Sequence, residues 1–284
     1  MDNPQFVWVY EKGRPYTPGD QHLWLYSPCR MSLAKAGAEK DFYAQVNDQG
    51  IVDYDSVEKK LEILEQPAQP VIDKIRQQHL INDDEKKILA DYIMLLFKRV
   101  KYQRNNPNDN WAKVKEETFA RLDKEVEELC ILHADKPHIV ANFQEAYKKT
   151  KLGYGDKPTP KLLNDQLFFR YEKMIEGLLE MNWSFAVNNT RSPFVASDNP
   201  IYFTRGAGLK KSDLTFPLSK EIALIASWSN LPYAYKPIGE QFVKNINRRT
   251  IALAVNHIYA PISAEWITTM ANKERYPESE LLRI

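Results

Sequence analysis

The hydrophobic pattern turns helical near residue 55 and changes again near residue 183. From about 55 to 182 apolar residues recur at helical spacing, and Ile88, Tyr92 and Leu95 form one such stripe. After Trp183 the apolar runs become short, are rich in Phe, Val, Ile and Tyr, and alternate with Pro, Gly and Asn, which predicts strands. These predicted strands are Trp183–Val187, Phe194–Ala196, Ile201–Phe203, Leu214–Phe216, Ile222–Trp228 and Ala252–Tyr259.

The order of these elements predicts the fold class. Helices followed by strands, without strand–helix alternation, are typical of α+β proteins with a mostly antiparallel sheet. Residues 1–54 contain an aromatic strand candidate, Phe6–Tyr10, which we expect to join this sheet as part of a hairpin. We therefore predict a single domain over residues 1–284, in which a helical bundle from residues 55–182 packs against the sheet of residues 183–284.

The composition is ordinary for a globular protein and excludes several classes. Hydrophobic residues make up 43% of the 284 positions and charged residues 27%, and the net charge is +1. The chain is therefore not a globally basic nucleic-acid binder, although a local basic patch stays open. Two cysteines are too few for a disulfide framework. We find no secretion signal and no apolar run of about 18 residues, which predicts a cytoplasmic protein without a membrane span.

The best single site candidate is Asp198, in the segment Ser197-Asp198-Asn199-Pro200. Pro200 keeps Asn199 out of the helical region, so the chain turns or stays extended directly after an apolar run. A carboxylate at the end of a buried strand has to be hydrogen-bonded, paired or metal-bound. Two interpretations are open. One is an Asx-turn with the local backbone; the other is a catalytic general base or metal ligand beside a cation such as Arg99.

Arg99 continues the apolar stripe of Ile88, Tyr92 and Leu95. A guanidinium does not lose its proton, and when buried it needs a carboxylate, phosphate or carbonyl partner. The alternative is that its stem packs while its head reaches water at the helix end. The basic segment 98–104 could meet nucleic acid, or its cations could stabilise the C-terminal end of the helix.

Glu39 and Asp41 stand two positions apart. In an extended segment both carboxylates would point to one face, which suits a divalent cation such as Mg²⁺ or Mn²⁺, but this spacing is also common on ordinary surfaces. The five histidines show no metal-binding spacing. The sequence contains no nucleophile elbow, zinc-protease motif or Rossmann fingerprint.

Several short blocks, which together span most of the chain, resemble a widespread and largely bacterial family catalogued as a domain of unknown function. Ser197-Asp198-Asn199-Pro200 matches its Ser-Asp-x-Pro motif, and Pro217-Leu218-Ser219 matches its Pro-Leu-Ser motif. Family members typically open with a His-Tyr-x-Pro-Gln/Arg segment, of which Pro4-Gln5-Phe6 would be a remnant here. The resemblance implies that this chain is inactive or truncated if the missing histidine is the family's acid or base.

Two hypotheses of function follow. In the first, Asp198 with Glu39 or Asp41 holds Mg²⁺ or Mn²⁺, and Arg99 neutralises phosphate charge during metal-assisted phosphodiester cleavage. Its concrete version is a nuclease-like effector in bacterial phage defence, acting on nucleic acid. In the second, the chain is a non-catalytic protein-binding or regulatory module, and Arg99–Asp198 is a structural ion pair. Metal binding would favour the first hypothesis, and a stable protein complex without a metal response would favour the second.

Overall fold

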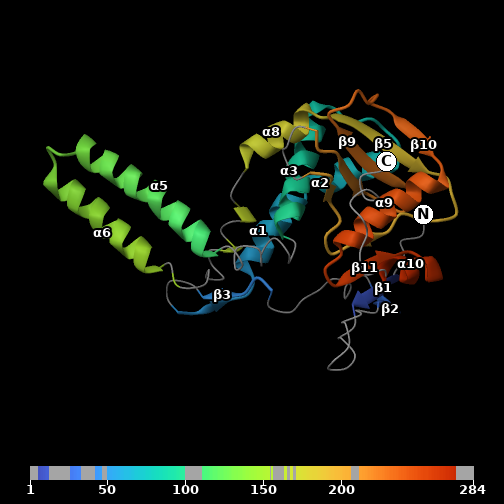
Figure 1. Ribbon diagram of the computed structural model, residues 1–284, viewed down its shortest axis with the longest axis horizontal. Coiled ribbons are helices and arrows are strands. Elements are labelled where there is room, and N and C mark those ends of the chain that lie inside the picture. The colour runs from blue at the N-terminus through green and yellow to red at the C-terminus, as the bar shows by residue number, and fades with distance from the viewer. Residues whose placement is uncertain are drawn as a thin grey trace. The chain divides into compact units, whose positions relative to one another are not determined.

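The computed structural model describes residues 6–12, 26–32, 42–46, 50–99, 111–153, 155, 163–164, 167–168, 171–205 and 211–272. The chain forms two compact units. The first, here called the sheet unit, comprises residues 1–42, 58–101 and 170–284, and the second, the hairpin unit, comprises residues 43–57 and 102–169. Helices combined with mostly antiparallel sheets confirm the predicted α+β class (Figure 1). The single domain stays a prediction.

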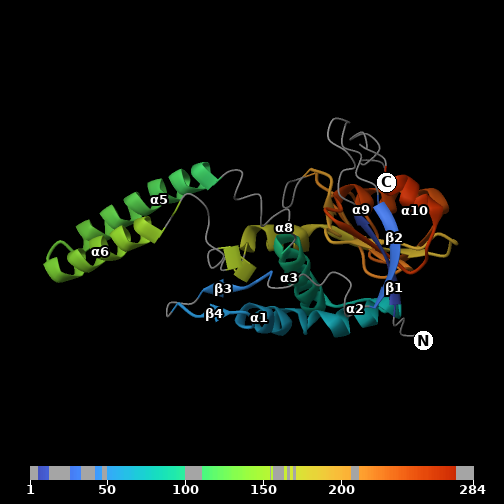
Figure 2. The same ribbon diagram turned by 90° about the horizontal axis from the view of Figure 1, so that it is seen from below.

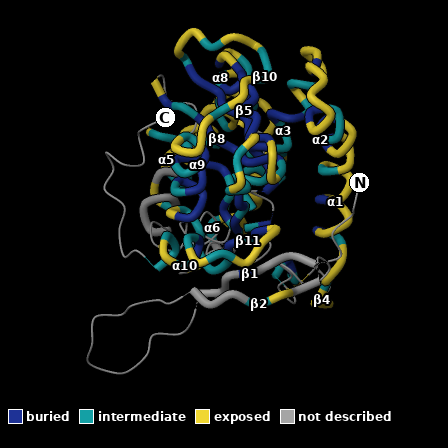
Figure 3. The backbone as a smooth tube through the Cα atoms, turned by 90° about the vertical axis from the view of Figure 1, so that its right-hand side faces the viewer, coloured by how far each residue is buried: buried dark blue, intermediate teal, exposed yellow. Residues whose placement is uncertain are grey.

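The sheet unit contains a five-stranded sheet with the order β10-β5-β9-β8-β7. Its strands are β5 (Asn182–Asn188), β7 (Tyr202–Phe203), β8 (Leu214–Pro217), β9 (Ile222–Ser227) and β10 (Tyr235–Ile238). Neighbouring strands pair antiparallel, except that β10 runs parallel to β5. Every residue of β8 and β9 is buried (Figure 3), as expected for strands that are covered on both faces.

A second sheet joins the N-terminal strands to the last strand, in the order β2-β1-β11-β6. Its strands are β1 (Phe6–Lys12), β2 (Tyr26–Ser32), β6 (Ala196–Ser197) and β11 (His257–Ala260). β1 pairs antiparallel with both β2 and β11, and β6 pairs antiparallel with β11. The N-terminal hairpin therefore belongs to this four-stranded sheet and does not extend the five-stranded one.

The main core lies between three helices and one face of the five-stranded sheet. These helices are α2 (Ala68–Arg76), α3 (Asp83–Arg99) and α8 (Glu172–Glu180). Leu89 and Ile93 of α3 share this core with Phe185 of β5 and Leu224 of β9, and none of the four exposes any surface. Helix α1 (Ser56–Glu65) precedes α2.

The opposite face of the same sheet packs against α9 (Glu240–Leu253). Side chains alternate between the two faces of a strand, so Ala223 and Ile225 of β9 meet Val243 and Ile246 of α9. The last helix, α10 (Glu265–Ala271), packs with Ile251 of α9 and with β11. Helix α9 therefore contributes both to this layer and to the core beside the four-stranded sheet.

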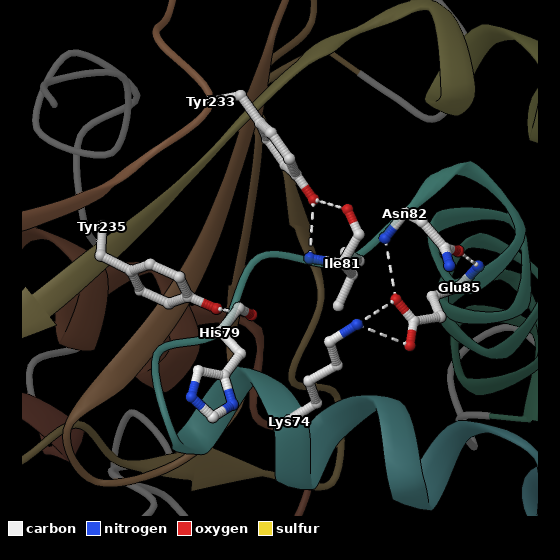
Figure 4. Close-up of polar contacts among 7 residues, drawn as sticks. All are labelled: Lys74, His79, Ile81, Asn82, Glu85, Tyr233 and Tyr235. Atoms are coloured by element: carbon white, nitrogen blue, oxygen red, sulfur yellow. Dashed lines mark hydrogen bonds and ion pairs between the residues drawn. The ribbon is translucent and has the colours of Figure 1, made fainter.

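Two tyrosines fix the connection between α2 and α3 (Figure 4). The Tyr233 hydroxyl accepts the Ile81 N–H at 3.1 Å and donates to the Ile81 carbonyl at 2.5 Å. The Tyr235 hydroxyl donates to the His79 carbonyl at 2.7 Å. Because buried backbone groups must be paired, the Tyr233 hydroxyl replaces partners that a helix or strand would have supplied to buried Ile81. The Tyr235 hydroxyl adds a bond to exposed His79.

Helix α3 begins with a capping box. The Asn82 side-chain oxygen accepts the Glu85 N–H at 2.9 Å, and the Glu85 carboxylate accepts the Asn82 N–H at 2.8 Å. Lys74 of α2 donates to the same carboxylate at 2.8 and 2.9 Å (Figure 4). These contacts lower the pKa of Glu85, the bond from Lys74 first and the Asn82 N–H second. The two helices are thus tied together at the point where the chain reverses.

The hairpin unit is built on two long helices, α5 (Trp111–Leu132) and α6 (Pro137–Gly153), which run side by side as an antiparallel pair (Figures 1 and 2). It also contains a short ribbon of β3 (Gln45–Val46) and β4 (Val52–Asp53). No helix among the described residues is long and apolar enough to cross a membrane.

Candidate functional site

The Asp198 carboxylate binds the backbone of the segment that joins α9 to β11. It accepts N–H groups from Val255 at 2.8 Å, Asn256 at 2.6 Å and His257 at 3.0 Å. The Asp198 N–H also donates to the His257 carbonyl at 3.1 Å. Three successive N–H groups around one anion form a nest. Both carboxylate oxygens are therefore engaged in fixing the start of β11.

The residues around Asp198 are held by further bonds to the backbone. The Ser197 hydroxyl accepts the Asn199 N–H at 3.2 Å, and Asp198 bonds to a segment distant in sequence. These contacts of the Asp198 carboxylate are therefore not those of an Asx-turn, the first of its two interpretations. Asn247, which exposes no surface, accepts the Val195 N–H at 3.0 Å and donates to the Pro193 carbonyl at 2.9 Å. Residues 193–198 are thus held by hydrogen bonds to α9 and to the residues at the start of β11.

His257 and Tyr259 lie beside this carboxylate. His257 Nδ1 is 3.8 Å from Asp198 Oδ2, and the rings of His257 and Tyr259 stack with centroids 6.1 Å apart. Burial, and secondarily the Asp198 charge, raise the pKa of the Tyr259 hydroxyl to about 12. The sequence shows His257 as an isolated histidine, because the pairing of β6 with β11 that brings it to Asp198 is a tertiary contact.

Arg99 lies at the end of α3 and forms an ion pair with Glu65 at the end of α1. Of the predicted stripe, Leu95 is buried, but Ile88 and Tyr92 are only half-buried beside fully buried Leu89 and Ile93. Arg99 lies on the same side as Ile88 and Tyr92, with 33% of its side chain exposed. Arg99 thus pairs with Glu65, whereas Asp198 lies beside His257, and among the described residues no ion pair joins Asp198 to Arg99.

The other predicted metal ligands, Glu39 and Asp41, lie outside the described residues. Among the residues that are described, no group of three or more His, Cys, Asp or Glu side chains is arranged to hold a metal ion. The predicted Mg²⁺ or Mn²⁺ site therefore stays a prediction, and the part of it that can be located is the Asp198 carboxylate in its backbone nest.

The hairpin unit presents a different kind of candidate, a surface. Half-buried apolar residues recur at spacings of three and four along both long helices, and the described side chains of α5 and α6 include none that is fully buried. The half-buried residues, here called the seam, are Phe119, Leu122, Val126 and Cys130 of α5 with Ile139, Val140, Phe143 and Tyr147 of α6. Such spacing is typical of an antiparallel pair in a helical bundle. In this pair, however, the two helices bury the seam side chains only partly.

One edge of the seam is closed by polar contacts. Asp123 of α5 accepts a hydrogen bond from the Tyr147 hydroxyl and another from Lys151 at 3.0 Å. The Lys151 ammonium also lies over the rings of Phe119, at 5.2 Å, and Tyr147, at 4.6 Å. We call Asp123, Tyr147 and Lys151 the closed edge.

The other edge of the seam is mainly apolar and largely exposed. Because a helix turns by about 100° per residue, Asp123 and Leu129 lie about 60° to either side of Val126. Leu129 is 37% exposed and Leu132 70% exposed. On α6 the same side of the seam carries half-buried Ile139 and exposed Ala146, with exposed Asn142 further out. We call Leu129, Leu132, Ile139 and Ala146 the open edge.

The sequence profile of the family described as "Protein of unknown function (DUF4238)" matches residues 25–264, which is most of the chain. The protein belongs to the DUF4238 family. The match includes the seam, the Asp198 nest and all of the five-stranded sheet. Searches of curated proteins and of solved structures found no match.

In this DUF4238 protein the segment Pro217-Leu218-Ser219 also shapes local backbone. The Ser219 hydroxyl accepts the N–H groups of Glu221 at 3.1 Å and Ile222 at 3.0 Å. The Leu218 N–H donates to the Ile222 carbonyl at 2.9 Å. These bonds make the tight turn between β8 and β9, so both segments that carried the family resemblance hold chain reversals in the sheet unit.

One buried charge of the DUF4238 chain was missed in the sequence. Arg249 of α9 exposes no surface, and its guanidinium lies 4.9 Å from the centre of the Tyr202 ring. Burial lowers the pKa of Arg249 to about 10, opposed by the charges of Tyr202 and Asp213. Arg249 continues the apolar positions Phe242 and Ile246 at spacings of four and three, the same signal that pointed to Arg99.

Proposed function

We propose that this DUF4238 protein is a non-catalytic protein-binding module that contacts its partner through the open edge of the α5–α6 pair. The observation that carries the proposal is the incomplete burial of the seam, together with exposed Leu129 and Leu132 beside it. Most of the stability of a helix in a protein comes from packing its apolar face, and here one side of that face meets solvent. Apolar side chains left exposed beside a half-buried apolar stripe are typical of interaction sites.

The contacts of the predicted catalytic residues support this choice over phosphodiester cleavage. An ionised carboxylate offers about four lone-pair sites, and at Asp198 three backbone N–H groups already use both oxygens. Arg99 is engaged by Glu65. A metal at Asp198 would compete with the N–H groups that fix the start of β11, and a phosphate at Arg99 would compete with Glu65.

Site-specific photo-crosslinking tests the proposal in cells that express the full chain. A photoreactive residue at Leu132, on the open edge, is compared with one at Ile63 of α1, because the two native side chains are 70% and 67% exposed. We expect a discrete protein adduct from position 132 and none from position 63. The adduct should disappear when Ala146→Glu is added on the open edge and persist with Ala141→Glu, which lies on the outer face of α6.

Absence of an adduct at position 132, or an equal adduct at position 63, would overturn the proposal. Melting temperatures of the wild type and Asp198→Asn, each with and without Mg²⁺ or Mn²⁺, then address the phosphodiesterase hypothesis. A ligand at about 100 times its Kd stabilises the folded state by roughly 2.7 kcal/mol. Metal stabilisation of the wild type alone would therefore favour the nuclease-like hypothesis over a binding module.

A further inference from the structure

We infer that the partner at the open edge is a second copy of this chain, so that two α5–α6 pairs form a four-helix bundle. This inference rests on the proposed function and names its partner. Two observations carry it beyond an exposed apolar surface: the two edges of the seam differ, and the two helices carry opposite charge.

The difference between the edges sets the direction of approach. The closed edge is occupied by Asp123, Tyr147 and Lys151, which bond to each other across the pair. The open edge offers Leu129 on α5 and exposed Ala146 on α6. A small residue allows a neighbouring helix to approach closely, and a large residue opposite it fills the space. A leucine on one helix and an alanine on the other are thus complementary when the two pairs meet through their open edges.

Two symmetric arrangements of two such helix pairs are possible, and the charges of the helices favour one of them. Helix α5 carries six acidic and four basic residues, whereas α6 carries one acidic residue and three lysines. A two-fold axis perpendicular to the helices would place α5 against the partner's α5, so that two acidic helices would face each other. The other axis, along the helices, places α5 on the partner's α6. Opposite charges favour the second arrangement.

In this arrangement Leu129 of one chain and Ala146 of the other lie at nearly the same level along the bundle axis. The ring contact between His133 and Phe143 fixes where the two antiparallel helices pass one another. Counting four residues back from His133 and four forward from Phe143 puts Leu129 level with Tyr147, the residue next to Ala146. A two-fold axis along the helices keeps these levels, so Leu129 of each chain enters the gap beside Ala146 of the other, while Asn142 stays at the polar rim.

Two exposed charges flank the open edge and fit the same arrangement. Glu125 of α5 and Lys149 of α6 lie beyond Leu129 and Ala146 on the open side, and each has an ionic partner one turn away on its own helix. In the bundle Glu125 of one chain lies opposite Lys149 of the other. Such rim pairs add little affinity but help to fix register and orientation.

The resulting bundle satisfies the usual packing rules. With the two-fold axis along the helices, each helix has antiparallel neighbours within its own pair and across the interface, as in an up-down four-helix bundle. The interface is isologous, so the same open edge serves both chains and the assembly closes as a dimer. The half-buried seam residues of both pairs then form one covered core.

Sedimentation of the 284-residue chain over a range of concentrations tests the inference. We expect a species with twice the chain mass of 33.1 kDa. Leu129→Glu and Ala146→Glu place a carboxylate in the apolar interface and should each raise the dimer Kd about a hundredfold. The matched controls are Ile131→Glu and Ala141→Glu, which lie on the outer faces of the same helices and should leave the Kd within about threefold.

Circular dichroism separates loss of the dimer from loss of the helices. Alanine and glutamate both have high helix propensity, so dimer loss in Ala146→Glu with unchanged helix content supports the inference. A monomer at every concentration, or a dimer that all four variants retain, overturns it. An adduct of the chain with a different protein at position 132 would keep the proposed function and refute the second copy. No adduct at position 132 would refute both.

Discussion

The two units of this protein differ in how completely they bury their apolar side chains. In the sheet unit, helices pack on both faces of a five-stranded sheet, and Leu89, Phe185 and Leu224 expose no surface. In the hairpin unit, α5 and α6 meet along a seam whose described residues are at best half-buried. Both units use amphipathic helices. Among the described residues, the sheet unit has a fully buried core and the α5–α6 pair does not.

The polar groups follow the same division. Asp198 and Asn247 of the sheet unit bond to backbone groups from 52 to 59 residues away in sequence. In the hairpin unit, pairs such as Arg121–Glu125 and Glu145–Lys149 join one helical turn to the next, and exposed pairs of this kind stabilise little. A buried polar group that bridges distant segments specifies a fold, whereas these exposed ion pairs join only neighbouring turns of one helix.

The largest expected effect tests this contrast with one substitution made in each unit. Leu89→Ala removes a side chain that exposes no surface and should lower the free energy of unfolding by about 3–5 kcal/mol. Leu122→Ala, at a half-buried seam position, should cost about 1 kcal/mol because part of its surface already meets water. Urea denaturation below the concentration at which the chain associates measures both. Equal losses would contradict the difference in burial between the units.

A smaller effect is expected at the Asp198 nest. Asp198→Ala leaves three backbone N–H groups without their acceptor, which should cost about 3 kcal/mol. Asp198→Asn keeps one acceptor oxygen, so its loss should fall between the wild type and the alanine variant. Hydrogen exchange of the Val255–His257 amides would show whether the loss is local. A fully stable Asp198→Ala protein would show that the nest is dispensable for folding and would free the carboxylate for another role.

The elements of the sheet unit were predictable where local pattern and tertiary packing agree. Continuous apolar runs predicted β5, β8 and β9 close to their observed bounds. Strand β10 escaped prediction because Pro237 interrupts it, and proline is tolerated there since β10 is an edge strand. The predicted strand over residues 252–259 began too early because α9 continues to Leu253.

The candidate sites were harder to predict because their partners are distant in sequence. Asp198 was expected to be hydrogen-bonded, paired or metal-bound. It is hydrogen-bonded, but its N–H donors come from residues 255–257, and nothing local indicates them. The helical spacing that singled out Arg99 would also have found Arg249. The seam residues were visible as an apolar stripe on a charged helix, but periodicity cannot tell whether a stripe is covered by the chain itself or left for a partner.

The smallest expected effect is a decrease in the free energy of unfolding at alkaline pH. Burial and Asp198 raise the pKa of Tyr259 to about 12, whereas an unfolded tyrosine has a pKa of about 10. Between these values the unfolded chain loses the proton and the folded chain keeps it, so stability falls as the pH rises from about 10 to 12. Because Tyr259 is only partly buried, its share of this fall should be below about 1 kcal/mol.

Tyr259→Phe removes this contribution and should flatten the decline in unfolding free energy measured by urea titration at about pH 9 and about pH 11, on either side of the ordinary tyrosine pKa. The slope that remains belongs to other sheet-unit tyrosines such as Tyr233, whose pKa is also raised by burial. Asp198→Asn should act in the same direction, since it removes the second cause of the shift at Tyr259. If neither substitution changes the slope, Tyr259 does not sense the Asp198 carboxylate, and the link between the nest and the histidine–tyrosine pair beside it has to be abandoned.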